Sequence, residues 1–96
     1  MKIDLNLLPV FIAVAEERNF TIAAARLGVT RSAVSQGIRR LEDTFGTMLV
    51  MRTTRSVNLT EAGERLRTSL SLSLSSIDAA FEDIASASTP RGLLRI

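Results

Sequence analysis

The chain has 96 residues, of which 46% are hydrophobic and 23% charged, with 12 basic against 10 acidic side chains. This length supports one ordinary domain with an apolar core, and it is too short for a barrel enzyme or a doubly wound nucleotide-binding fold. Histidine, cysteine, tryptophan and tyrosine are absent. We therefore expect no imidazole base, thiol nucleophile, disulfide framework or structural zinc site, and neither catalytic residues nor metal ligands.

No apolar run approaches the roughly 18 residues of a membrane span, and no signal peptide opens the chain. We expect a cytoplasmic, nucleoid-associated protein without membrane contact. The positive charge is concentrated between residues 26 and 55, where six arginines stand against two acidic residues, a net charge of +4. Arginine suits bidentate contacts with phosphate and guanine. An ordinary solvated surface is the alternative interpretation of such a run.

A first helix is predicted from about Leu5 to Arg18, with Asp4 as its N-cap. Pro9 either costs this helix an early hydrogen bond or moves its start to Asn6. The following residues, up to position 15, are apolar almost all round. Such a helix is usually covered on more than one side.

Two further helices joined by a tight turn are predicted next. One begins after Thr21 as N-cap and ends at Gly28, a position that often needs a left-handed residue. The other is capped by Thr30 and extends to about Phe45, with Gly46 closing it. Two helices around a glycine-containing turn, with small alanines where they cross, form the helix-turn-helix pattern. Plain helical bundles contain the same pattern.

The third helix has two different faces. At about 100° per residue, an apolar stripe forms within roughly 40° of one direction. It consists of Val34, Ile38, Leu41 and Phe45. The face away from it carries hydroxyls, an amide and an arginine, and its members are Ser32, Ser35, Gln36 and Arg39, with Asp43 as the misfit. A merely solvated face would more often carry Glu/Lys pairs, whereas these groups read base edges and grip phosphates.

Residues 47–59 predict a small β-hairpin, because an apolar run is followed by a polar stretch and then by alternation. Arg52 and Arg55 lie at or near its tip. An arginine on a β-wing beside a reading helix can enter a minor groove, whose negative potential attracts it. The alternative is a surface loop with incidental charge.

A last helix is predicted from the cap Thr60, with Glu61 and Glu64 near its positive end. Residues 69–75 alternate Ser and Leu like a strand, but a heptad pattern over the longer run favours a helix. The predicted heptad positions are Leu70, Leu74, Ile77, Phe81 and Ile84. Leu66 is left to pack on the domain. The pattern suggests a partner helix, most commonly through two-fold self-association.

Three parts are therefore expected along the chain. Residues 1–59 form the helix-turn-helix with its wing, and residues 60–88 form the linker and dimerisation helix. Residues 89–96 begin as a linker and end like the start of a strand. We expect the chain to stop where a second domain would begin.

Several blocks in this order resemble the DNA-binding domain of LysR-type transcriptional regulators, over about residues 3–88. They are Phe20-Thr21-Ile22-Ala23-Ala24, Leu27-Gly28-Val29-Thr30, Ala33-Val34-Ser35, Ile38-Arg39-Arg40-Leu41-Glu42, Gly46, Leu49, Arg52-Thr53-Thr54-Arg55 and Leu59-Thr60-Glu61-Ala62-Gly63. The tail from Gly92 to Ile96 is similar to the start of that family's effector-binding domain.

The resemblance implies a mainly α fold: a winged helix-turn-helix of three helices plus a short hairpin wing, followed by a long dimerising linker helix. The helix-turn-helix corresponds to residues 20–39 and the reading helix to residues 30–43. The implied DNA-binding residues are Thr30, Arg31, Ser32, Ser35, Gln36, Arg39, Arg52, Thr53 and Arg55. Of the helical ones, Arg31, Ser32 and Gln36 are expected to face bases. Ser35 and Arg39 are expected to hold the backbone.

The function implied is sequence-specific binding of double-stranded DNA by a homodimer at an inverted repeat. The third helix would enter the major groove and the wing the minor groove. No cofactor is expected here, whereas a small-molecule inducer would bind the missing effector domain of a tetrameric full-length protein. Arg31-Ser32 stand where the family often has Gln-Pro, and Gly37 where Gln, Ala or Thr is common, so base specificity cannot be transferred. A helical protein-interaction module without specific DNA binding is the alternative.

Overall fold

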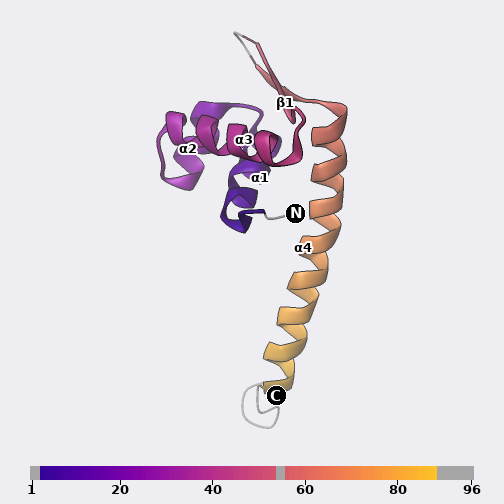
Figure 1. The fold of residues 1–96 in the computed structure, drawn as a ribbon. Coiled ribbons are helices and arrows are strands. Elements are labelled where there is room, and N and C mark those ends of the chain that lie inside the picture. The colour runs from indigo at the N-terminus through magenta and orange to yellow at the C-terminus, as the bar shows by residue number, and fades with distance from the viewer. Residues whose placement is uncertain (1–2, 54–55, 89–96) are drawn as a thin grey trace.

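The computed structural model describes residues 3–53 and 56–88 of the chain, which form a small head and one long helix (Figure 1). The elements are η1 (Leu5–Leu7, a 3-10 turn), α1 (Leu8–Glu17), α2 (Phe20–Leu27), α3 (Arg31–Phe45), β1 (Val50–Arg52), β2 (Val57–Leu59) and α4 (Glu61–Ser88). This is the predicted winged helix-turn-helix followed by a long helix. The predicted hinge and strand start at residues 89–96 lie outside the described residues.

The first predicted helix is divided into η1 and α1. Asp4 is a cap as predicted, but it caps the 3-10 turn: its side chain accepts a hydrogen bond of 2.9 Å from the Asn6 amide. Pro9 then lies in the first turn of α1, where its missing N–H has no helical partner to lose. The helix ends at Glu17, because Arg18 adopts a left-handed conformation with φ 55°.

The predicted start of α2 was wrong by two residues. Asn19, with an extended backbone, is the N-cap and accepts a 2.8 Å hydrogen bond from the Ile22 amide. Asparagine and threonine are both good caps, so local chemistry does not choose between Asn19 and Thr21. With Asn19 as the cap, Phe20 becomes the first helical residue and its side chain is buried.

The other predicted ends of α2 and α3 are confirmed. Thr30 caps α3 by accepting a 3.0 Å hydrogen bond from the Ala33 amide. Gly28 and Gly46 close α2 and α3 with φ of 72° and 69°, a region that favours glycine.

The core lies where α1, α2 and α3 meet. Val34, Ile38 and Leu41 are 0% exposed, as the predicted stripe requires, and Phe45 packs at its edge. They share one cluster with Phe11 and its neighbours on α1. Gly37 explains the close approach of α1, because a Cβ there would lie 3.2 Å from the Val10 side chain.

The hairpin is antiparallel, with Val50 opposite Leu59 and Arg52 opposite Val57. Val50, Val57 and Leu59 face the head and are buried. The predicted apolar run at 48–51 only partly enters the core. Leu49 and Val50 are buried, whereas Met48 and Met51 are exposed.

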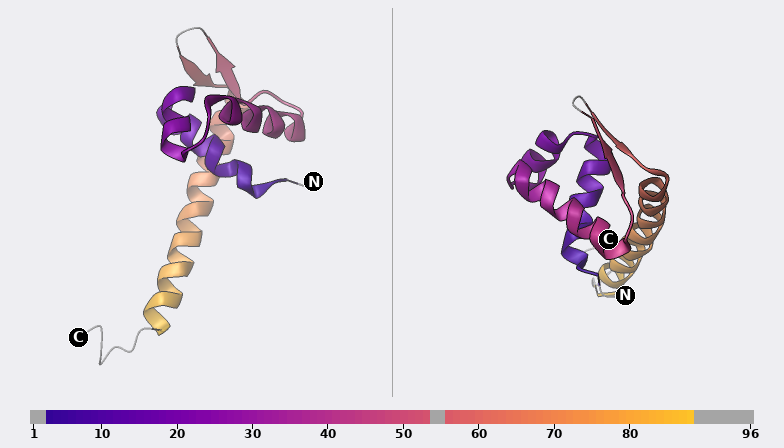
Figure 2. Two further views of the ribbon diagram at one scale, coloured as in Figure 1. Left: turned by 90° about the vertical axis from the view of Figure 1, so that its left-hand side faces the viewer. Right: turned by 45° about the horizontal axis from the view of Figure 1, so that its top comes forward.

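Helix α4 leaves the head as a free rod (Figure 2). Thr60 caps it as predicted: its hydroxyl accepts from the Gly63 amide at 3.0 Å and donates to the Met48 carbonyl at 2.7 Å. Leu66 packs on the head as predicted, and so does Leu70, which the heptad pattern had assigned to a partner. No helix among residues 3–53 and 56–88 is long and apolar enough to cross a bilayer.

The seat of α4 on the head predicts that Gly63 does not tolerate alanine. A Cβ at Gly63 would collide with the backbone carbonyl oxygen of Leu49. We expect G63A to lower the free energy of unfolding by about 2 kcal/mol, although alanine favours helices. Chemical denaturation followed by circular dichroism measures this.

The matched control is G37A, which also adds one methyl group to a helix. Its nearest neighbour is a side-chain methyl of Val10 rather than a backbone atom. We expect it to change stability by less than about 1 kcal/mol. Equal stabilities for the two variants would contradict the close seating of α4 on Leu49.

Candidate nucleic-acid interface

Helix α3 presents a polar face to solvent opposite its buried stripe. Ser32, Gln36 and Arg39 are exposed on it, and Ser35 is half-buried. Helical periodicity predicted these four side chains for the outward face. Asp43, the acidic exception, is also exposed.

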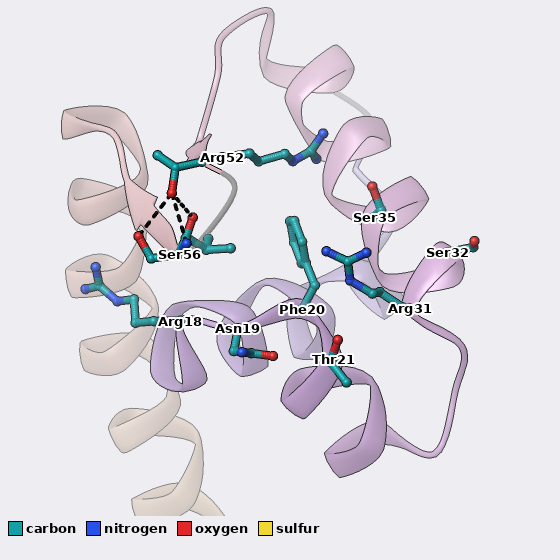
Figure 3. Close-up of a pocket in the computed structure, with 11 residues that line it drawn as sticks. Arg18, Asn19, Phe20, Thr21, Arg31, Ser32, Ser35, Arg52 and Ser56 are labelled. Carbon is teal, nitrogen blue, oxygen red and sulfur yellow. Dashed lines mark hydrogen bonds between the residues drawn. The ribbon is translucent and has the colours of Figure 1, made fainter.

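Beside this face, an open groove of about 480 Å³ lies between the start of α2, the N-terminal half of α3 and the hairpin (Figure 3). Apart from Phe20 and Val57, its lining is basic or polar, and no carboxylate belongs to it. The residues are Arg18, Asn19, Phe20, Thr21, Arg31, Ser32, Ser35, Arg52, Thr53, Ser56 and Val57. Three other hollows on the described surface each contain at least one carboxylate, from Glu42 and Asp43, from Glu16, or from Glu61 and Glu64.

Two arginines from different elements converge on one aromatic ring in this groove. The guanidinium carbon of Arg31 lies 5.9 Å from the centroid of the Phe20 ring, and that of Arg52 lies 5.2 Å from it. A cation within about 6 Å of a ring face is attracted by the ring quadrupole. Arg31 thus points back over the ring, whereas the hydroxyl of Ser32 points away from it (Figure 3).

Ion pairs neutralise other arginines but not these two. Arg26 pairs with Glu16 at 2.7 Å and with Glu17 at 3.1 Å, and these carboxylates raise the pKa of Arg26 above its usual value. Among the described residues, neither Arg31 nor Arg52 has a carboxylate within salt-bridge distance. At Arg31 and Arg52 the groove therefore holds positive charge that no carboxylate in the described part of the chain neutralises.

Glu64 neutralises the third arginine of the groove. It pairs with Arg18 at 3.3 Å and with Arg67 at 3.1 Å. Hydrogen bonds from these guanidiniums lower the pKa of the Glu64 carboxyl below its usual value, and the bond from Arg67 has the larger effect. Arg18 thus joins the end of α1 to the first turn of α4 at one side of the groove.

Several predicted site residues also have structural contacts. The Thr30 hydroxyl is occupied as the cap of α3. The Thr53 hydroxyl accepts from the Ser56 amide at 2.9 Å and donates to the Ser56 carbonyl at 2.9 Å, across the hairpin (Figure 3). Arg55 lies outside the described residues.

Two residues that shape this surface, Phe20 and Glu42, were not predicted from the sequence as site residues. The Phe20 ring lies beneath the guanidinium of Arg31 and also beneath that of Arg52. Glu42 is buried, with 7% exposure, and its Oε2 accepts from the amides of Leu49 at 2.8 Å and Val50 at 3.2 Å. It thereby fixes the start of β1 against α3. An acid next to the exposed Asp43 gives no local signal of this burial.

A family model described as "Bacterial regulatory helix-turn-helix protein, lysR family" matches residues 5–64. The chain is 49% identical over 90 residues to the HTH-type transcriptional regulator PgrR of Escherichia coli, and this alignment covers 93% of this chain and 30% of PgrR. It is 42% identical over 95 residues to the HTH-type transcriptional regulator PtxR of Pseudomonas aeruginosa, and this alignment covers 98% of this chain and 30% of PtxR. The chain thus spans about a third of the length of these curated relatives.

Solved structures are similar over nearly the whole chain. The BenM_DBD/benA site 1 DNA complex matches with a TM-score of 0.83 and 30% identity, over 92% of this chain and 99% of that one. The CbnR_DBD-DNA complex matches with a TM-score of 0.79 and 29% identity, over 91% and 100% of the two chains.

Because the buried carboxylate of Glu42 accepts two backbone hydrogen bonds, we expect removal of its side chain to destabilise the start of β1. E42A leaves the amides of Leu49 and Val50 without their acceptor, and each buried unsatisfied group costs about 1–3 kcal/mol. We expect hydrogen exchange at these two amides to accelerate strongly, with a lower free energy of unfolding. D43A, at the exposed neighbour, should leave both unchanged. Protected amides in E42A would show that Glu42 does not hold the wing.

Proposed function

Because the chain belongs to the lysR family of bacterial regulatory helix-turn-helix proteins, we propose that it is the sequence-specific DNA-binding domain of a transcription regulator. The observation that carries this is the pairing of a buried stripe with a polar outward face on α3, beside a groove rich in arginine. The similarity to two DNA complexes supports it. The domain acts by binding, without catalysis.

In this proposal α3 enters the major groove. Ser32 and Gln36 reach base edges, where an amide can bind adenine through two hydrogen bonds. Ser35 and Arg39 hold the backbone and fix the register. Thr30, Arg31, Arg52, Thr53 and Arg55 are the other members of the DNA-binding set that the sequence predicts, and Arg55 is directed to the minor groove. Arginine contacts to phosphates release counterions and make affinity depend on salt.

Two copies bind together through α4. Beyond Leu70, four apolar side chains of the heptad pattern are exposed on the free part of the helix: Leu74, Ile77, Phe81 and Ile84. Pairing these positions across a two-fold axis would bury them and set two α3 helices at a fixed separation. The preferred DNA site is then an inverted repeat, with half-sites about one helical turn, or a multiple, apart.

The whole protein is longer than this chain in the proposal. Residues 1–59 form the DNA-binding unit, 60–88 the dimerisation helix, and 89–96 the hinge to an effector-binding domain. That domain would bind a small-molecule inducer in a tetrameric protein of the cytoplasm. The relatives PgrR and PtxR are each about three times as long as their matched part.

Selection of bound sequences from a random duplex pool tests the proposal. We expect an inverted repeat to emerge, with an affinity that falls by orders of magnitude from low to moderate salt. The second candidate, a protein-interaction module, is favoured by the exposed apolar positions of α4. It predicts dimers that bind duplex DNA no better than a charge-matched control protein.

Gln36 and Arg39 separate base reading from backbone binding. We expect Q36A to weaken binding to the selected site by about 1–3 kcal/mol and to leave binding to a scrambled duplex nearly unchanged. R39A should weaken both and reduce the salt slope by about one. Fluorescence anisotropy titrations measure both. Equal losses on both duplexes for Q36A would contradict its role at a base edge.

The apolar positions of α4 predict a change in self-association. Phe81 is on the heptad pattern and 69% exposed, whereas Leu72 is off it and 68% exposed. We expect F81D to weaken the dimer at least about tenfold, because a charge would be buried between helices. L72D is the matched control and should leave the dimer intact. Sedimentation equilibrium measures both, and equal effects would remove the proposed pairing.

A further inference from the structure

We propose that Arg31, Phe20 and Arg52 form a preorganised site for a single phosphate of the DNA backbone, in which Phe20 is the positioning residue. The inference rests on the proposed DNA binding and deepens it. It moves Arg31 from base reading to backbone binding. It also separates Arg52 from the minor-groove role predicted for the wing.

The shared ring orders two side chains before any ligand arrives. Phe20 is only 7% exposed and belongs to the core cluster, so its ring is fixed at the start of α2. Arg31 approaches it from α3 at 5.9 Å, and Arg52 approaches it from β1 at 5.2 Å. A guanidinium over a ring face keeps the N–H donors in its own plane for another partner. Ordering long side chains in advance lowers the entropic cost of binding.

The charges around the ring call for one anion. Two guanidiniums share the ring without a carboxylate in salt-bridge distance among the described residues, and none lines the groove. Arg18, at the side of the same groove, is instead paired with Glu64. A phosphodiester has one negative charge and two unesterified oxygens, so it can accept hydrogen bonds from both free guanidiniums and reduce their repulsion.

The position of the groove identifies the phosphate as one of the DNA backbone. The groove lies between α3 and the hairpin (Figure 3). When a reading helix occupies the major groove and a wing the adjacent minor groove, one sugar–phosphate strand runs between them. That strand then faces Arg31, Arg52 and the half-buried residue Ser35.

A scan of single neutral phosphates tests the site directly. Each backbone phosphate of the selected duplex is replaced in turn by a methylphosphonate, and affinity is measured for the parent, R31A, R52A and R40A. We expect one phosphate per half-site at which the replacement weakens the parent about tenfold. The same replacement should have little effect in R31A and in R52A. R40A removes an exposed arginine outside the groove and should keep the full effect.

The role of Phe20 is tested by coupling. F20L keeps an apolar side chain but removes the ring, and F20Y keeps the ring. We expect F20L to weaken DNA binding several-fold in the parent and to have almost no further effect in the R31A/R52A double variant. F20Y should retain parental affinity. Circular dichroism and thermal unfolding identify folded variants, and the arginine variants alone decide the case if F20L does not fold.

The outcomes separate this inference from the proposed function. If R31A and R52A respond to different phosphates, or F20L costs the same without the two arginines, the shared site is wrong while DNA binding stands. If inorganic phosphate alone saturates the two arginines at micromolar concentration, the ligand is free phosphate and the backbone assignment is overturned. If the parent binds no duplex, the proposed function fails first.

Discussion

The burial of one narrow stripe of α3 is the constraint on which the rest of this structure depends. Val34, Ile38 and Leu41 are fully enclosed, and α1 comes close enough to Gly37 that a Cβ there would press on Val10. A helix fixed along one stripe cannot rotate about its axis without exposing those side chains. The opposite face is therefore held toward solvent at the same time. The outward direction of Ser32 and Gln36 is a consequence of core packing.

A second joint, around Leu49, connects the helices of the head to the wing and to α4. The Glu42 side chain, on α3, accepts a hydrogen bond from the amide of Leu49. The amide of Thr60, which caps α4, donates a 3.0 Å hydrogen bond to the carbonyl of Leu49. Because Gly63 has no side chain, the carbonyl of Leu49 can lie against it. Three elements with different proposed tasks, α3, the wing and α4, thus meet at one residue. The orientation of α4 relative to the polar face of α3 is fixed by the contacts at this residue.

The arginines differ in whether a carboxylate lies beside them, and this difference decides where the surface is basic. Ion pairs with Glu16, Glu17 and Glu64 neutralise the charges of Arg18, Arg26 and Arg67 on the protein surface. Arg31 and Arg52 instead lie over Phe20 without such partners among the described residues. A net charge of only +2 is therefore compatible with a strongly cationic groove. The distribution of carboxylates decides which surface is basic.

The sequence by itself determined the features that depend on neighbours within a turn. Thr30, Gly28, Gly46 and Thr60 could be assigned because a cap or a left-handed residue acts on amides or carbonyls a few positions away. The two faces of α3 followed from helical periodicity, the hairpin from its apolar and polar stretches, and the last helix from its cap and heptad pattern, and the family resemblance implied the same elements.

Only the tertiary structure decided the rest. It chose Asn19 over Thr21 as a cap, turned Leu70 back onto the head, buried Glu42 and brought Arg31 and Arg52 to one ring. The physical reason is common to these cases. Each depends on a contact between residues distant in the chain, or on a choice between locally equivalent groups, and periodicity and capping rules contain neither.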